Sequence, residues 1–483
     1  MTRLLEVFRR YAGKRAFIAF FILCALPNGL MMALLTPPGE VPDEPAHMDR
    51  AAGLLHGVIL AGRKSYIDPN TQKLAWQAGF KEDAGLAQAA GGQETMIGNL
   101  PVYTAADFLA VRAIPSDHRK VFVHMANTVK FFPAAYVPAA LGLALGLAVN
   151  APPYVCFYLG RLFMLAAFLA LGVLALGLTE YGEAALLSVL ILPSTLLLAG
   201  SMNQDGVLIA VACLACAALT RGTRRMRLLS IVLAVLLVGA KLPYIFLLGV
   251  FVLPLSSPDF WRRVRDAALA CAPVLVWVAL VGLFVAVPFN RAPYHPGPLY
   301  SGDPNVLFDR TSVSANLHIL LAQPSRFITL PWSTSVAQGP VILAGLAGVL
   351  SSFEVSFPAT YDWLWCGCLA VAFAGLAFSP RLVAPAPRAA WVNFLFVSFL
   401  LLASYWLILI GEYLDWTNVG MDFISGMQSR YLLPMLPFLL FAIPQLRCRF
   451  KLHPFVPAIP SILLGIADLG YLPVKLVLGY YLH

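Results

Sequence analysis

The residues best suited to chemistry gather in one short stretch after the first apolar run. Residues 39–50 read Gly-Glu-Val-Pro-Asp-Glu-Pro-Ala-His-Met-Asp-Arg and include Asp43, Glu44 and His47. Only 12% of the 483 residues are charged, so this density of acids needs a reason. Carboxylates serve as general bases or as metal ligands. We therefore predict that the stretch is the reacting end of a membrane enzyme, just outside the bilayer, with Asp43 and Glu44 as catalytic candidates.

Each of these residues also has a structural explanation. Asp43 and Glu44 would stabilise the N-terminus of a helix that begins near Pro45, because acids favour that end. His47 is as well explained by a structural hydrogen bond as by a ligand role. The order Asp-Glu-Pro-Ala-His also differs from the H-E-x-x-H pattern of zinc proteases.

Further polar groups follow at the borders of later apolar runs. Lys and Arg bind anions such as phosphate, whereas charges at a membrane border are costly unless they are solvated or paired. Alternatives remain open, since Asp205 would also cap a helix that starts at Gly206, and the basic residues would also anchor spans at the interface. Arg161 lies inside an apolar run, where we expect it to be paired within the bundle. The border groups are Lys130, Asn203, Asp205, Lys241, Arg430 and Tyr431.

The composition predicts an all-α integral membrane protein. Hydrophobic residues make up 60% of the chain and the mean hydropathy is +0.78, more apolar side chain than a soluble protein of this length can cover. The net charge of +9 sits in short basic clusters beside apolar runs, which is typical of orientation signals and not of nucleic-acid binding. The eight cysteines lie nearly all in apolar runs and indicate buried thiols.

The positive-inside rule places the acidic stretch on the outer side. Basic residues precede the apolar run 16–35, which we interpret as an uncleaved first span. A first extracytoplasmic loop, 36–130, follows. Within it we expect a helix in 56–67 and a juxtamembrane helix in 100–112. A second outer loop covers 288–361, and we treat residues 1–483 as one polytopic domain.

Crossing parity decides the rest of the topology. If all four apolar runs between Lys130 and Leu219 crossed, the basic segment 221–227 would lie outside. We therefore predict that 131–149, broken by Pro133 and Pro138, is a re-entrant or juxtamembrane element. About eleven transmembrane helices result. Parity then places all the polar border groups on the same outer face as Asp43.

At this point the residues resemble a known group. The resemblance rests on four motifs and covers roughly residues 37–434: Pro42-Asp43-Glu44-Pro45-Ala46-His47, Ser201-Met202-Asn203-Gln204-Asp205, Lys241-Leu242-Pro243-Tyr244 and Gly426-Met427-Gln428-Ser429-Arg430-Tyr431-Leu432-Leu433-Pro434. In this order they look like an uncharacterised family of bacterial multipass membrane proteins that resembles the GT-C glycosyltransferases. The resemblance implies a GT-C-like fold and a polyprenyl-phosphate-linked sugar donor.

The resemblance also implies roles for the residues. Asp43, or else Glu44, would activate the acceptor or bind a metal, and Asp205 would be a second acid that contacts the acceptor or a metal such as Mg or Mn. No clear D-x-D motif supports metal dependence. The remaining assignments are Lys130, Lys241, Arg430 and Tyr431 at the donor phosphate, and His47 and Asn203 beside the acceptor.

The expected activity is inverting transfer of a hexosyl or pentosyl group to an extracytoplasmic acceptor, which would be a cell-envelope glycan or polysaccharide, a lipid or another glycoconjugate. The expected place is the bacterial inner membrane, with a cytoplasmic N-terminus and a periplasmic active site. Two other functions remain open: a flippase or transporter of lipid-linked saccharides, and a polymerase or ligase that uses a lipid-diphosphate oligosaccharide.

Overall fold

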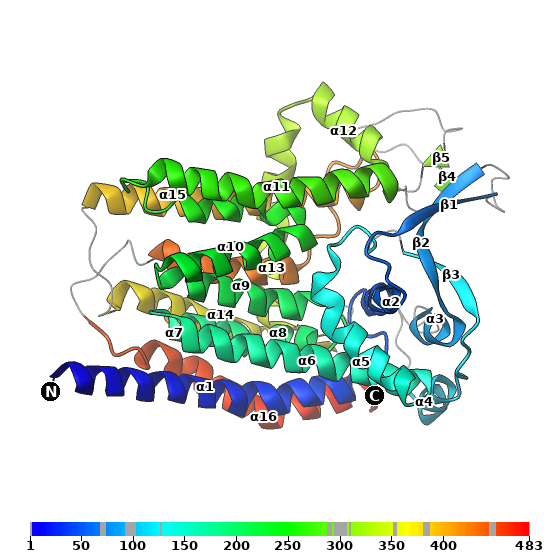
Figure 1. The fold of residues 1–483 in the computed structure, drawn as a ribbon, viewed down its shortest axis with the longest axis horizontal. Helices are drawn as coiled ribbons and strands as arrows, with labels where there is room; N and C mark the ends of the chain where they lie inside the picture. The colour runs from blue at the N-terminus through cyan, green and yellow to red at the C-terminus, as the bar shows by residue number, and fades with distance from the viewer. Residues whose placement is uncertain are drawn as a thin grey trace.

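Helices make up most of the molecule, and a small sheet lies at one end of the bundle (Figure 1). The computed structural model describes residues 2–67, 74–91, 103–125, 128–286, 292–293, 307–308, 311–350, 355–379, 387–443 and 451–482. Much of the predicted second outer loop, 288–361, lies outside the described residues.

Within these ranges, six helices are long and apolar enough to cross a bilayer, or up to seven spans if one bent helix pair counts as a single span. The six lie in α1 (Thr2–Leu35), α6 (Pro153–Leu178), α11 (Phe260–Phe284), α14 (Ala359–Ala374) with η4 (Gly375–Phe378), α15 (Pro387–Asp415), and η8 (Val456–Ala458) with α16 (Ile459–Tyr480). The prediction of a multipass helical membrane protein is confirmed. The figure of about eleven spans stays a prediction.

Further helices pack among and beside these six. They are α7 (Glu183–Leu190), α8 (Pro193–Ala199), α9 (Gln204–Thr220), α10 (Arg224–Ala240), η3 (Leu242–Val252), α12 (Val313–Ala322), α13 (Arg326–Gly348), η5 (Ser429–Tyr431) and η6 (Leu433–Phe441). Of these, α8 and α9 form the bent pair, at 114°.

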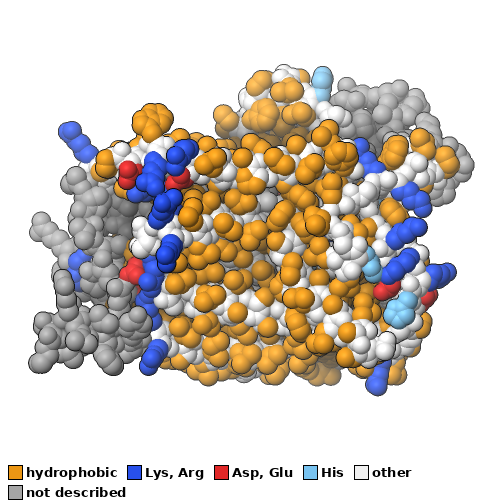
Figure 2. Space-filling view, viewed as in Figure 1, with side chains coloured by type: hydrophobic (Ala, Val, Ile, Leu, Met, Phe, Trp, Pro, Cys, Tyr) orange, Lys and Arg blue, Asp and Glu red, His pale blue; other side chains and the backbone are white. Residues whose placement is uncertain are grey.

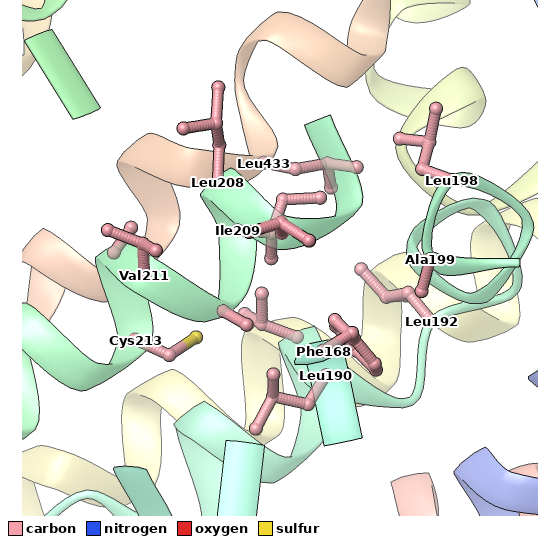
Figure 3. Packing of buried hydrophobic residues seen from close by; sticks show 14 of the residues in the cluster. Phe168, Leu190, Leu192, Leu198, Ala199, Leu208, Ile209, Val211, Cys213 and Leu433 are labelled. Carbon is pink, nitrogen blue, oxygen red and sulfur yellow. The ribbon is translucent and has the colours of Figure 1, made fainter. Parts of the chain in front are cut away.

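The centre of the core is α9, which is apolar all round and buried from Gln204 to Ala218. Leu208, Ile209 and Cys213 project from it toward side chains of neighbouring helices (Figure 3). The reversal between α8 and α9 requires glycine at 206, because an added Cβ would come within 2.5 Å of the backbone nitrogen of Ala199. The thiols of Cys213 and Cys216 are buried here and free, as their apolar surroundings predict.

One end of the bundle, here called the sheet end, carries the first loop (Figure 1). An antiparallel sheet pairs β1 (Gly62–Ile67) with β2 (Leu74–Asp83), and β2 with β3 (Lys120–His124). Around it lie α2 (Glu44–Leu55), α3 (Ala84–Gly91), α4 (Ala105–Arg112), η2 (Pro133–Tyr136) and α5 (Val137–Ala148). Two-residue pairs also join β4 (Ala292–Pro293) to β5 (Leu307–Phe308) and β6 (Val349–Leu350) to β7 (Val355–Ser356).

The small sheet of the first loop was not predicted from the sequence, although the fold is mostly helical, as expected. The expected helix in 56–67 is wrong, since α2 ends at Leu55 and residues 62–67 form β1. The error has a physical reason. The strand β1 is stabilised by backbone hydrogen bonds to β2, and the local propensity of residues 56–67 does not reveal this pairing. The helix expected in 100–112 is present as α4, residues 105–112.

The opposite end, here called the arginine end, gathers the starts of α1, α10 and α11. Lys14 donates to the carbonyl oxygen of Gly177 at 3.0 Å, and Arg221 to that of Leu178 at 2.6 Å. Lys and Arg side chains edge the apolar surface there (Figure 2). At the sheet end, the C-terminal part of α16 contacts the first loop, where the amide of Tyr103 donates to Tyr480 at 2.8 Å.

The segment 131–149 folds as η2 followed by α5. The 12 residues of α5 span about 18 Å, too little to cross a hydrocarbon core of about 30 Å. The helix packs closely on α6: at Gly142, an added Cβ would come within 2.4 Å of the carbonyl oxygen of Leu159. Whether this segment enters the outer leaflet stays a prediction.

The arrangement of the two ends predicts membrane sidedness. Reporter fusions truncated after Asp117 and after Gly200 should lie on one side of the membrane, and a fusion after Gly222 on the other, because Asn203 contacts Pro42 at the sheet end while Arg221 contacts Leu178 at the arginine end. Paired alkaline phosphatase and fluorescent-protein fusions measure this. Opposite sides for Asp117 and Gly200 would contradict the topology.

Candidate functional site

The acidic stretch folds into a turn that projects Asp43 away from its own helix. Asp43 immediately precedes α2 and has a left-handed backbone, with φ of 62° and ψ of 7°. Aspartate tolerates this conformation better than most residues. The side chain makes no capping hydrogen bond to α2, so the simple capping explanation is wrong. The carboxylate instead pairs with Arg430.

Arg430 joins this turn to the start of the apolar segment that contains η6. One terminal nitrogen of its guanidinium binds the Asp43 carboxylate, and the other donates to the carbonyl oxygen of Pro42 at 3.0 Å. The same carbonyl accepts a hydrogen bond of 2.9 Å from the side-chain amide of Asn203. Three segments, at 42–43, 203 and 430, are thus held together around a single carbonyl oxygen.

The second ion pair lies alongside the first. Asp205 binds Nζ of Lys241 at 2.7 Å, and its Oδ2 lies 3.6 Å from Nε of Arg430. The cap of α9 is Asn203, whose Oδ1 accepts from the amide of Asp205 at 2.9 Å, which leaves the Asp205 carboxylate free for Lys241. We call Asp43, Asp205, Lys241 and Arg430 the four-charge cluster. The structure therefore brings together four residues that the sequence places on one face.

An aromatic floor lies beneath the basic groups. Nζ of Lys241 lies 4.2 Å from the centre of the Tyr431 ring, within the range of a cation–π interaction. The hydroxyl of Tyr244 donates to the carbonyl oxygen of Tyr431 at 2.8 Å. The ring of Tyr431, predicted at the donor phosphate, therefore contacts Lys241 of the cluster. The hydrogen bond from Tyr244 holds the backbone of Tyr431 in place.

The charges of the cluster cancel one another. Burial is the largest single effect and raises the pKa of the Asp43 carboxyl, but the charge of Arg430, the hydrogen bond from Arg430 and the other positive groups nearby together hold that pKa below its usual value. Asp43 is therefore ionised at neutral pH, and its carboxylate is a weak base while Arg430 remains bound to it. An entering anion would have to take the place of Asp43 or Asp205 on these cations.

His47 faces the interior of the sheet end and does not join the cluster by hydrogen bond. Its Nδ1 lies 2.6 Å from the hydroxyl of Tyr136, and its ring stacks on those of Tyr136 and Phe131. Burial lowers the pKa of His47 to about 4, so the imidazole is neutral at physiological pH. This geometry suits a structural hydrogen bond.

Glu44 lies in a separate, fully buried ion pair. Both of its carboxylate oxygens accept from Arg161, at 2.8 and 2.6 Å, and one also accepts from the amide of Met202 at 3.0 Å. The remaining donors of Arg161 bind the carbonyl oxygens of Ala33, Thr36 and Pro37. The expected pairing of Arg161 within the bundle is confirmed, and Glu44 has no oxygen left without a strong donor.

Lys130 lies at the partly exposed edge of the site and contacts none of the four residues of the cluster directly. Its Nζ binds Asp415 at 2.5 Å, and both side chains are partly exposed. Nearby, Glu412 interacts electrostatically with Lys241, Lys130 and Arg430, yet within the described chain its carboxylate forms no ion pair. We did not single out Glu412 from the sequence. Its signal was an acid in the last turn of a long apolar run, where charges are rare.

The residues do not fit a metal ion. Over the described ranges, no group of three or more His, Cys, Asp or Glu could hold one. Asp43 and Asp205, the predicted ligands for Mg or Mn, each bind a cationic side chain. We therefore derive no step through a metal.

Two buried acids, one from β2 and one from α2, lie close together. Glu82 is fully buried, and Asp49 of α2 is 9% exposed. Burial first, and then the nearby charge of Asp49, raise the pKa of Glu82 to about 10. Glu82 is therefore protonated at neutral pH, where its carboxyl group lies close to that of Asp49.

A family model described as "Predicted membrane protein (DUF2142)" matches residues 26–439. The chain belongs to the DUF2142 family of predicted membrane proteins. The match includes all four residues of the cluster. No curated protein and no solved structure gives a significant match.

The Glu44–Arg161 pair gives a stability prediction for this DUF2142 protein. Arg161→Met should lower the free energy of unfolding by about 3–5 kcal/mol, because it leaves a buried carboxylate without its counter-charge. The double variant Glu44→Gln/Arg161→Met should recover part of that loss. Arg221→Met removes a partly exposed pair with Glu180 and should cost less than about 1 kcal/mol. Equal thermal shifts for Arg161→Met and Arg221→Met would contradict the structural role.

The raised pKa of Glu82 predicts that the stability of the fold depends on pH. In the unfolded chain Glu82 ionises near its ordinary pKa of 4.5, whereas in the fold its pKa is about 10. Between these values the unfolded state loses its proton first, so the wild type loses stability as pH rises, by at most about 1.4 kcal/mol per pH unit. Glu82→Gln should therefore gain stability relative to the wild type between pH 5 and 9. A stability difference between Glu82→Gln and the wild type that does not change with pH would contradict the assignment.

Proposed function

We propose that this protein is an inverting membrane glycosyltransferase that moves a sugar from a polyprenyl-phosphate donor to an extracytoplasmic acceptor. The observation that carries the proposal is the four-charge cluster, in which two acids and two bases from four distant segments meet at one end of a membrane bundle. Its charges lie beside an apolar interior, where a lipid-linked anion would present its phosphate.

The phosphate would be held by Lys241 and Arg430 over Tyr431. Both cations are already compensated, by Asp205 and Asp43, so donor binding is an exchange of one anion for another. Asp43 is the better candidate to leave, because it is 36% exposed whereas Asp205 is 2% exposed. A phosphate on Arg430 would release the Asp43 carboxylate, whose pKa would then rise and make it a stronger base.

This exchange favours Asp43 over Glu44 as the activating acid. Glu44 is saturated by Arg161 and by the amide of Met202, and removing those donors would leave Arg161 buried without a counter-charge. Asn203 and Asp205 would line the acceptor side, and His47 would support the turn through Tyr136. Lys130, at the rim, would attract the donor headgroup before it enters.

The reaction is a single displacement. The acceptor oxygen bonds to the anomeric carbon from the face opposite the donor phosphate, the bond from that carbon to the phosphate oxygen breaks, and polyprenyl phosphate leaves with the electron pair. The acceptor proton passes to Asp43. General-base help of this kind supplies about 10²–10⁴-fold. Lys241 and Arg430 bind the phosphate more strongly as its charge grows, which stabilises the transition state.

The exchange predicts opposite effects on binding and turnover. Asp43→Asn should lower sugar transfer at least about 100-fold, and it should leave the affinity for polyprenyl phosphate unchanged or tighter, because Arg430 loses its internal partner. Transfer in proteoliposomes and binding of labelled polyprenyl phosphate measure the two effects. Asp117→Asn, an exposed acid of the same loop, is the control. Full transfer by Asp43→Asn would place the base elsewhere.

The phosphate clamp predicts a donor-specific loss. Lys241→Gln and Arg430→Gln should raise the KM for the donor at least about tenfold and leave the KM for the acceptor nearly unchanged, because a charge-assisted hydrogen bond to phosphate is lost. Only variants that keep the wild-type elution profile and thermal transition are compared. Lys81→Gln, on the exposed side of β2, is the control. Equal effects on both substrates would argue against the clamp.

A further inference from the structure

A groove opens on the bundle surface between α10 and α11. Its volume is about 340 Å³, and apart from Asp266 its lining is apolar. Leu228, Val232 and Leu269 are more than half exposed along it. Ala270 and Pro273 form its α11 wall, where small side chains leave the helix surface hollow. The lining residues are Leu228, Ile231, Val232, Val235, Leu236, Asp266, Leu269, Ala270 and Pro273.

The groove begins at the arginine end. Asp266 lines it and binds Nε of Arg227 at 3.3 Å. Around this pair the ends of α10 and α11 carry six arginines against two acids, Asp259 and Asp266: Arg224, Arg225, Arg227, Arg262, Arg263 and Arg265. Arg224, Arg225 and Arg262 form no hydrogen bond or ion pair through their side chains within the part of the chain that the structure describes. The mouth of the groove is thus strongly positive, and an anion there would relieve the repulsion between neighbouring guanidinium groups.

An aromatic contact lies beyond the far end of the groove. One helical turn beyond the last lining residues, Phe132 packs on Gly239 of α10 and forms an edge-to-face contact with Trp277 of α11, with ring centres 5.1 Å apart. The indole of Trp277 also donates to the carbonyl oxygen of Lys130 at 3.0 Å. These aromatic rings separate the groove from the four-charge cluster.

The length of the groove fits one leaflet. From Leu228 to Leu236 the helix rises about 12 Å, close to half of a hydrocarbon core of about 30 Å. An acyl chain whose headgroup lies at the arginine end would fill it. A chain entering from the sheet end would have to pass Phe132 and Trp277. Charge, length and the aromatic contact beyond the far end therefore indicate the same occupant.

We propose that the groove between α10 and α11 binds an acyl chain of an anionic phospholipid, with its phosphate against the arginines at the mouth. This site is distinct from the four-charge cluster and does not depend on the proposed activity. The phosphate would accept hydrogen bonds from Arg225 and Arg262, and Trp261, 78% exposed at the start of α11, would lie at the headgroup level, as interfacial tryptophans do.

The test is a lipid titration of the full-length protein in detergent, read by native mass spectrometry. Phosphatidylglycerol and phosphatidylcholine with identical chains are the two probes. The wild type should bind phosphatidylglycerol at least about tenfold more tightly. Arg225→Gln and Arg262→Gln should each weaken that lipid about fivefold and leave phosphatidylcholine unchanged. Arg119→Gln, exposed at the sheet end, is the charge control.

A second pair of variants tests whether the lipid's acyl chain lies in the groove. Leu269→Trp should fill the groove and weaken both lipids, whereas Leu283→Trp, equally exposed on α11 outside the groove, should change neither. Equal affinity for the two lipids, or an equal effect of Arg119→Gln, would overturn the headgroup assignment. If Leu269→Trp acted no differently from Leu283→Trp, or if polyprenyl phosphate displaced phosphatidylglycerol one for one, the proposal would be wrong.

Discussion

Burying the charge of Arg161 inside an apolar bundle is the constraint on which the sheet end depends. An isolated guanidinium there would be prohibitively unstable, so every donor must be satisfied, and the partners come from distant segments. Glu44 supplies two oxygens, and the carbonyls of residues 33, 36 and 37 supply the rest. These bonds fix the end of α1, the start of α2 and the middle of α6 relative to one another. The turn at 37–43 therefore has a single position, which aims Asp43 outward.

The four-charge cluster follows from that position. With the turn fixed, the carbonyl of Pro42 accepts from both Asn203 and Arg430, so the α8–α9 reversal and the segment before η6 converge on it. Two ion pairs result, one nearly buried and one partly open. Asp205 is almost fully buried and stays bound to Lys241, whereas Asp43 has the exposure of a group that can exchange partners. This difference in exposure distinguishes the two acids more clearly than residue type does.

Much of the bundle could be predicted from hydropathy. Crossing parity and the order of short motifs predicted a common site for Asp43, Asp205, Lys241 and Arg430. The ion-pair partner of each acid could not be predicted from the sequence. Asp43 and Glu44 are adjacent in sequence and chemically alike, yet one pairs with Arg430 and the other with Arg161, because a left-handed residue at 43 turns their side chains apart. The sheet was not predicted for a similar reason, since β2 also pairs with β3, which lies much further along the chain, with Asp83 opposite Lys120. Glu412 could not be predicted as a member of the site, because no sequence motif surrounds this acid.

The central claim, that the cluster receives a lipid-linked sugar phosphate, is tested most directly by identifying the lipid that co-purifies with the wild-type protein. Mass spectrometry of lipids extracted after mild solubilisation, compared with Arg430→Gln and with the control Lys81→Gln, separates specific from bulk lipid. We expect a polyprenyl monophosphate-linked sugar that is enriched on the wild type and on Lys81→Gln and depleted on Arg430→Gln. Enrichment of a lipid-diphosphate oligosaccharide instead, or equal recovery from all three proteins, would contradict it.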